Sequence, residues 1–263
     1  MPRSNTVCAL ALLSVLPTVA LGGLTNMEVY LGVETESSID IQASSFIDRE
    51  YDESAFERVL TPLFGFDSVA TASHDTMVEH NGQSAHNTNI TTLNTDANGF
   101  VFGATMNSTA ERGSGFQSYA STDSTFDLLM VFDADTVLDI FLRIDYRDIG
   151  NADLAAEFSL SGLQGAPLDQ IGVENPQSDG FVELAFQATV LAGETFTLGG
   201  GGFIILSTGD HGDSLSSGDL ALTAIVRVVP APGGLAVFGG FGLLAARRRR
   251  GVVNQQGMGA CSC

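Results

Sequence analysis

Lysine and tryptophan are absent from this chain of 263 residues, and only four tyrosines and three cysteines occur. All eleven basic residues are therefore arginines, and five of them lie near the two ends of the chain. Residues 23–229 hold the other six arginines and all 31 acidic residues, so this region carries a net charge of about −25. Such a surface repels phosphates and attracts cations, which excludes nucleic-acid binding.

The cysteines lie at positions 8, 261 and 263, outside this central region. A disulfide framework or a zinc site built from cysteines is therefore excluded for residues 23–229. The chain has no tryptophan and only four tyrosines, and its seventeen phenylalanines are better suited to a core. This composition argues against an aromatic carbohydrate-binding face.

The N-terminus has the features of a secretory signal peptide. Arg3 precedes an apolar run over residues 7–16, Pro17 ends the run, and small residues follow through Gly23. The run is too short to span a membrane. We expect a signal peptide over residues 1–22, Sec-type export and cleavage after Ala20 or Gly22; the alternative is a buried N-terminal strand.

The C-terminus contains three parts in a fixed order. Val229-Pro230-Ala231-Pro232 is extended and accessible to a protease, because proline cannot donate a backbone hydrogen bond. An uncharged Gly/Ala/Leu/Phe segment over residues 233–246 follows, and then Arg247, Arg248, Arg249 and Arg250. The arginines should stay in the cytoplasm under the positive-inside rule, with the residues before Val229 outside.

These three parts resemble a PEP-CTERM sorting signal over about residues 230–250. Pro230 and Pro232 match the motif prolines, residues 233–246 match its helix, and the four arginines match its basic cluster. Ala231 stands where the motif has glutamate, and an unassigned tail, residues 251–263, continues past the point where family members usually end. The resemblance implies export, a transient membrane anchor and processing by an exosortase-type protease. A C-terminal anchor that is not processed is the alternative.

The region between the ends predicts an all-β domain over residues 23–229. Residues 136–146 alternate apolar and polar side chains over the length of a half-buried strand. Glycine, asparagine, aspartate and serine separate similar runs at residues 27–33, 100–104, 126–132, 155–160, 181–190, 195–198, 203–206 and 220–229. We expect an antiparallel β-sandwich, jelly-roll-like, with about eight or more strands.

Four local features complete the expected fold. Phe56, Val59 and Leu60 form a stripe that predicts a short helix over residues 52–60. Residues 192–194 predict a tight hairpin between their flanking strands, and residues 199–202, four glycines, predict a broken or bulged strand. Residues 68–98 are polar with isolated apolar side chains, so we expect a long surface excursion with at most short edge strands.

No catalytic constellation stands out. His74, His80 and His86 are spaced six residues apart, which fits neither one helix face nor adjacent positions on a strand face, so we expect solvated loop histidines rather than a metal site. The chain has no Gly-x-Ser-x-Gly elbow. Calcium is the cation that acidic turns would favour, and its weak candidate ligands are Asp133, Asp135, Asp210 and Asp213. No cofactor is expected otherwise.

These observations predict an exported, non-enzymatic protein of the cell surface or extracellular matrix. Its expected partners are the export machinery, the exosortase-type protease, the membrane before processing, and exopolysaccharide. A secreted carbohydrate-binding module and a secreted hydrolase are the alternatives.

Overall fold

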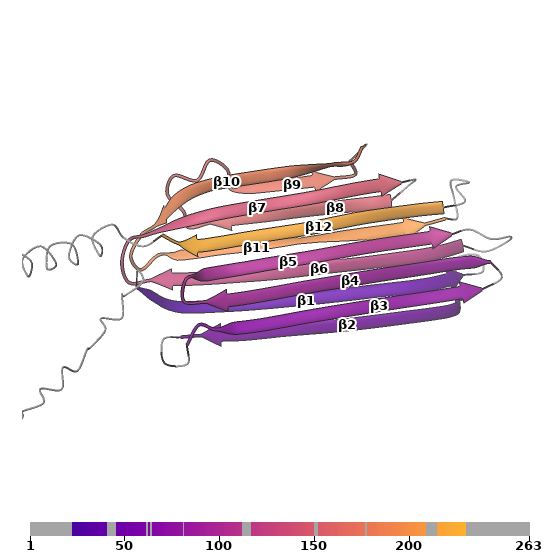
Figure 1. Cartoon of the computed structure of the whole chain (residues 1–263), viewed down its shortest axis with the longest axis horizontal. Helices are drawn as coiled ribbons and strands as arrows, with labels where there is room; N and C mark the ends of the chain where they lie inside the picture. Colours follow the sequence, from indigo (N-terminus) through magenta and orange to yellow (C-terminus); the bar gives the residue numbers. More distant parts are fainter. Residues whose placement is uncertain are drawn as a thin grey trace, which may run out of the picture.

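The computed structural model describes residues 23–40, 46–61, 63, 65–80, 82–111, 117–149, 152–176, 178–208 and 215–229. These residues form two six-stranded antiparallel sheets whose strands run along the long axis of the molecule (Figure 1). Sheet A has the order β2 (Phe46–Leu60), β1 (Leu24–Asp40), β6 (Gln117–Phe132), β11 (Thr195–Ser207), β8 (Ala152–Ser161), β9 (Gln170–Glu174). Sheet B has the order β10 (Gly180–Val190), β7 (Thr136–Ile149), β12 (Leu215–Val228), β5 (Gly99–Glu111), β4 (Gln83–Asp96), β3 (Ser68–His80).

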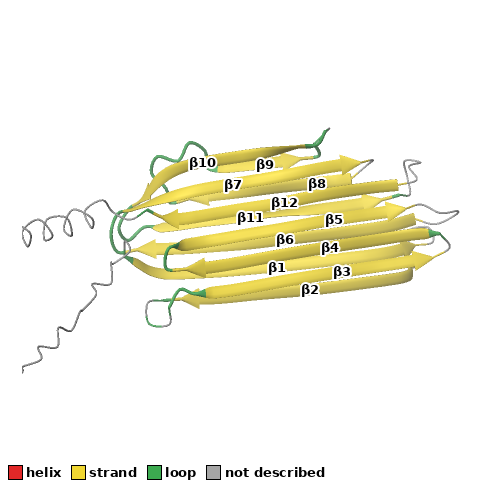
Figure 2. Cartoon of the chain, in the orientation of Figure 1, coloured by secondary structure: helices red, strands yellow, loops and turns green. Residues whose placement is uncertain are grey.

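The expected all-β sandwich is confirmed, since Figure 2 shows only strands and loops among the described residues. Each strand turns alternate side chains to the inside, as the period of two requires. In β7, for example, Leu138, Ile140, Leu142 and Ile144 are all buried. The run over residues 136–146 was therefore predicted correctly in its start and its inner face, although β7 continues to Ile149.

The centre of the core is aromatic. Phe100 and Phe102 of sheet B stack on Phe126 of sheet A, with ring centroids 5.5 and 4.1 Å apart. Phe158, also of sheet A, has its ring centroid 6.0 Å from that of Phe126. All four rings are fully buried, so they join the two sheets where both are apolar.

The predicted helix over residues 52–60 is wrong, because these residues belong to edge strand β2. Phe56 and Leu60 lie opposite Leu31 and Met27 of β1 and face the core. A spacing of four residues places side chains on one face of a strand as well as of a helix. The exposed Val59 points the other way.

The predicted hairpin at residues 192–194 is wrong as well. The turn is tight, since Glu194 N donates to Leu191 O at 3.0 Å. However, β10 pairs with β7 in sheet B, whereas β11 pairs with β6 and β8 in sheet A. The turn therefore carries the chain from one sheet to the other.

The polar segment over residues 68–98 is not a surface excursion. It forms the long strands β3 and β4, which pair with each other, and β4 also pairs with β5. The inward positions of β4 include Asn87, Asn89 and Thr91, all fully buried. Hydrophobic periodicity did not reveal these strands because the residues that face inward there are polar.

Hydrogen bonds between the sheets satisfy these buried polar groups. Asn89 Nδ2 donates to Thr122 Oγ1 at 3.0 Å and to Asp123 O at 2.8 Å, both on β6. Thr91 Oγ1 donates to Asn89 Oδ1 at 2.7 Å and lies 3.1 Å from Ser124 Oγ. Leaving such groups buried without partners would cost free energy of folding, so the network fixes how sheet B sits on sheet A.

Asn87 extends this network to β1. Its Nδ2 donates to Glu36 O and, at 3.0 Å, to Ser37 Oγ. Its Oδ1 accepts a hydrogen bond from Ser108 Oγ on β5. We call the buried set formed by Ser37, Asn87, Asn89, Thr91, Ser108, Thr122 and Ser124 the polar seam.

The first and last described residues lie at the same end of the sandwich, beside the β6–β7 connection (Figure 1). Gly23 O accepts a hydrogen bond from Asp133 N at 2.8 Å, and Val229 N donates to Val137 O at 2.9 Å. The predicted leader (residues 1–22), the predicted sorting signal (residues 230–250) and the unassigned tail (residues 251–263) lie outside the described residues. Among the residues described, no helix is long and apolar enough to cross a membrane.

The polar seam makes a stability prediction. Asn87→Ala removes three hydrogen bonds and leaves the Ser108 hydroxyl without its acceptor, so the free energy of unfolding should fall by about 2 kcal/mol. Asn94→Ala, at an exposed position of the same strand, is the control and should change it by less than about 0.5 kcal/mol. Urea unfolding of both variants measures the difference. Equal stabilities would contradict a structural role for the seam.

Candidate functional site

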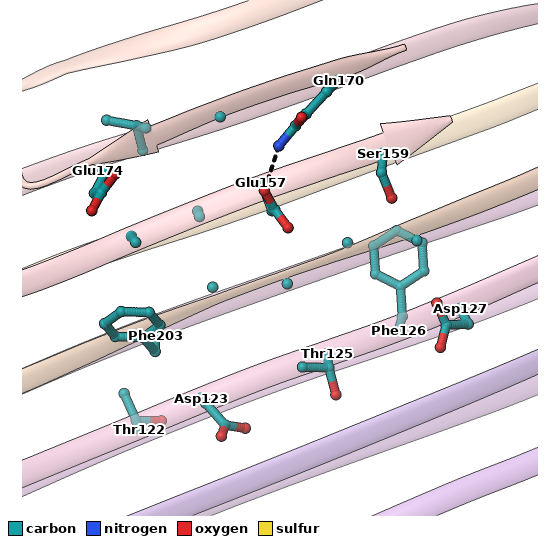
Figure 3. A pocket seen from close by; sticks show the side chains of 18 of the residues that line it. Thr122, Asp123, Thr125, Phe126, Asp127, Glu157, Ser159, Gln170, Glu174 and Phe203 are labelled. Carbon is teal, nitrogen blue, oxygen red and sulfur yellow. Dashed lines mark hydrogen bonds between the residues drawn. The ribbon is translucent and has the colours of Figure 1, made fainter. Parts of the chain in front are cut away.

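A groove with a volume of about 1310 Å³ lies on the outer face of sheet A. Its walls and floor come from β6, β11, β8 and β9, and several of its side chains appear in Figure 3. The outward residues form three successive rows across these strands, as the pairing register defines. The rows are Asp127–Gly199–Ser159–Gln170, then Thr125–Gly201–Glu157–Gly172, then Asp123–Phe203–Ala155–Glu174.

Glycine makes the groove. Gly199 and Gly201 of β11 and Gly172 of β9 occupy outward positions, so no side chain rises from the floor there. A Cβ on Gly199 would lie 2.9 Å from Asp127 Oδ1, and one on Gly201 would lie 2.8 Å from Ser124 O. The floor is therefore open because these residues lack Cβ atoms.

The same run of glycines also serves the core, and the predicted break in the strand is wrong. Strand β11 passes through residues 199–202 with its pairing to β6 and β8 unshifted. Gly200 faces inward, where a Cβ would lie 2.5 Å from Phe158 and 2.7 Å from Phe126. Its lack of a side chain lets these two rings meet.

The groove is acidic. The described residues that line it include the carboxylates of Asp123, Asp127, Glu157, Asp169 and Glu174, and no arginine or histidine. Gln170 Nε2 donates to Glu157 Oε2 at 2.6 Å, which holds that carboxylate between Gly201 and Gly172 (Figure 3). Phe203 provides an aromatic ring on the floor in the third row. The groove thus offers hydrogen-bond acceptors, hydroxyls and one apolar surface.

A row of three carboxylates leads into the groove from the edge of sheet A. Glu53, Glu34 and Asp123 are direct neighbours on β2, β1 and β6. Asp123 is half-buried, and its burial, together with the charges of Glu34 and Glu53, raises its pKa to about 6. Like charges opposite one another on paired strands are destabilising.

This row predicts a pH dependence of stability. Because the pKa of Asp123 is higher in the folded chain than its usual value of 3.8, the charged form costs folding free energy above about pH 6 and the cost disappears as the pH falls towards 4. Asp123→Asn should therefore raise the free energy of unfolding above pH 6 by about 1 kcal/mol, allowing for solvent screening, and by little at pH 4.

Thermal unfolding across this pH range measures the effect of Asp123→Asn. The gain should be smaller in a Glu34→Gln background, where one repelling charge is already gone. A variant that is less stable than the parent at every pH would contradict the assignment.

The weak calcium candidates are only partly described. Asp133 and Asp135 lie in the β6–β7 connection, where Asp135 Oδ1 accepts a hydrogen bond from Ala192 N at 2.9 Å. Asp135 thus supports the turn between β10 and β11. Asp210 and Asp213 lie outside the described residues. Within the described ranges, no three histidine, cysteine, aspartate or glutamate side chains form a group that could hold a metal ion.

The predicted processing motif is described only at its first residue. Val229 follows β12 and is bonded to Val137 through its backbone. Pro230, Ala231, Pro232 and the cluster Arg247–Arg250 lie outside the described residues.

The histidines do not lie in a loop, so that prediction is wrong. His74 is on β3 and buried, and His80 ends the same strand. His86 is on β4, and its Nε2 lies 2.8 Å from Asp75 Oδ1. The sequence did not place the three histidines on strands because the apolar alternation that marks a strand is missing here.

His74 lies between the two edge strands β2 and β3. Its Nε2 is 3.0 Å from Ser54 Oγ, and its Nδ1 is 3.8 Å from Asp52 Oδ2. This order of groups matches that of a Ser-His-Asp triad, but 3.8 Å is too long for a hydrogen bond and none of the three residues lines the groove. The contact is a polar link between the sheets.

The comparisons with known proteins name no relative. No family model and no curated protein matches the sequence. The solved structure of the infectious bursal disease virus VP2 subviral particle aligns with 88% of this chain and 75% of its own, at 10% identity and a TM-score of 0.15. A structure of the infectious bursal disease virus Gx strain aligns with 89% of this chain and 76% of that structure's chain, at 10% identity and a TM-score of 0.15. A TM-score of 0.15 supports no inference about fold or function.

Proposed function

We propose that this chain is an exported, non-enzymatic protein of the cell surface or extracellular matrix whose sandwich binds polysaccharide in the groove of sheet A. The observation that carries the proposal is the groove, a polar trough with a glycine floor on the outer face of a rigid sheet. The groove is the surface on which the exopolysaccharide partner expected from the sequence would bind.

The chemistry of the groove suits an extended chain of sugars. Residues 121–127 of β6 line one side over about 20 Å, at the usual rise per strand residue. Asp127, Glu157 and Ser159 can accept or share hydrogen bonds with hydroxyl groups. Phe203, partly exposed on the floor, offers a ring on which a sugar can pack. This ring compensates in part for the absence of tryptophan.

The proposed address rests on the ends of the sequence. A cleaved leader sends the chain through the Sec-type machinery, and the PEP-CTERM-like signal anchors it in the membrane until an exosortase-type protease acts near Pro230. Strand β12 ends at Val228, only two residues before that site. The sandwich would therefore extend from the membrane along its long axis, with the groove on its side. The crossings between sheets from β5 to β8 support a jelly-roll-like arrangement.

The proposed export and anchoring route predicts two cleavages of the chain, one near each end. Intact-mass analysis of the protein recovered from the cell exterior should show the loss of the leader and of Arg247–Arg250. Pro230→Ala with Pro232→Ala should leave the tail attached, because the extended segment before the helix is lost. Arginines 247–250 on released parent protein would contradict the proposed processing.

The groove predicts a binding site that a side chain on its floor can block. Gly199→Val should fold, because the nearest atoms to its Cβ are the far ends of the Asp127 and Ser159 side chains. Its polysaccharide affinity should fall about tenfold or more, since the branched side chain fills the trough. Pull-down on a panel of neutral, amine-bearing and acidic polysaccharides measures the change.

Gly103→Val is the matched control. Gly103 is also an outward glycine in a central strand, but on sheet B, where a Cβ meets only ordinary contacts at 3.5 and 4.0 Å. This variant should bind as the parent chain does. Binding that Gly199→Val leaves unchanged, or no binding to any polysaccharide, would refute the proposed function.

A further inference from the structure

Several carboxylates on the outer face of sheet B have arginine partners, whereas the described residues provide none for the carboxylates of the groove. On sheet B, Arg143 forms hydrogen bonds with Asp145 at 2.6 and 2.7 Å and with Glu183 at 3.0 Å, and it lowers the pKa of Asp145. Arg147 and Arg227 of sheet B pair with Asp219 and Asp96. Among the described residues, no ion pair involves a carboxylate that lines the groove.

The unpaired charges lie on both sides of the glycine floor. Asp127 stands on β6 and Glu157 on β8, the two neighbours of β11, in successive rows. At about 4.8 Å between strands, the two backbones are separated by about 10 Å, with Gly199 and Gly201 between them. A polymer over the floor therefore has a carboxylate within reach on either side.

Phe203 adds a second element to this pattern. It follows Gly199 and Gly201 at the next outward position of β11, and its row contains Asp123 on β6 and Glu174 on β9. Figure 3 shows the Phe203 ring near the Asp123 side chain. An apolar ring flanked by carboxylates suits a sugar ring that bears a cationic group better than a simple cation.

We infer that the groove binds a polysaccharide that carries free amines, a polymer of amino sugars that are not N-acetylated. This inference rests on the proposed function and specifies its ligand. Ammonium groups pair with Asp127 and Glu157, the sugar ring packs on Phe203, and hydroxyls bond to Ser159 and Thr125. An acidic polysaccharide is repelled by the same carboxylates, and a neutral one gains no charge pairing.

The test compares a glucosamine polymer with its N-acetylated form, a neutral glucan and an acidic uronate polymer, all binding to the full chain. We expect the glucosamine polymer to bind most tightly, with an affinity that falls as salt is added. The double variant Asp127→Asn with Glu157→Gln should reduce that affinity about tenfold, because two unpaired charges are lost while the shapes of the side chains remain.

A second double variant controls for the overall negative charge. Asp139→Asn with Glu79→Gln also removes two negative charges, but from exposed, outward positions on sheet B. It should change the affinity by less than about twofold, because these residues are far from the groove. An equal loss in both double variants would mean diffuse attraction to an acidic protein and would overturn the inference.

The remaining outcomes separate the inference from the proposed function. Equal binding of the N-acetylated or neutral polymer, still blocked by Gly199→Val, would overturn the amine requirement and leave the proposed function intact. Equal, groove-dependent binding of an arginine-rich peptide would also overturn the inference, because the groove would then recognise charge without the sugar. If no polysaccharide binds in a way that Gly199→Val weakens, both the inference and the proposed function are refuted.

Discussion

The packing of the two sheets depends on a constraint that polar side chains impose. Apolar contacts tolerate small shifts between sheets, whereas the amides of Asn87 and Asn89 must meet specific partners on β1 and β6. Any slip that separates them leaves buried polar groups without partners, at a cost of about 1–3 kcal/mol each. The stacking of Phe100 and Phe102 on Phe126 contributes to the attraction between the sheets, and the polar seam selects one register.

How much of the fold was predictable depended on whether each strand carried apolar side chains inward. Strands such as β7 and β12 follow that rule, and their positions were predicted from the sequence. Strands β3 and β4 were missed because the residues that bury in them are mainly Ser, Thr, Asn and His, whose burial depends on partners from β1, β2 and β6. Residues 52–60 of strand β2 were predicted to be a helix because Phe56 and Leu60 satisfy either period.

The groove was beyond prediction for a different reason. Its carboxylates come from β6, β8, β9 and the connection between β8 and β9, and only the pairing of β6, β11, β8 and β9 brings them together. Two signals were nevertheless present. Asp123, Thr125 and Asp127 alternate with buried residues, which marks a polar outward face, and the four glycines lie between two halves of one strand. Sequence alone interpreted those glycines as a break, although each pair serves one face of an unbroken strand.

The position of the two chain ends has a consequence for engineering. Gly23 and Val229 both flank the β6–β7 connection, so the sandwich begins and ends at nearly the same place. A domain with adjacent ends can be placed within a surface loop of another protein without separating that loop's two sides. The same geometry allows the ends to be joined by a short linker and new ends to be opened elsewhere. This chain is thus a suitable donor for domain insertion and for circular permutation.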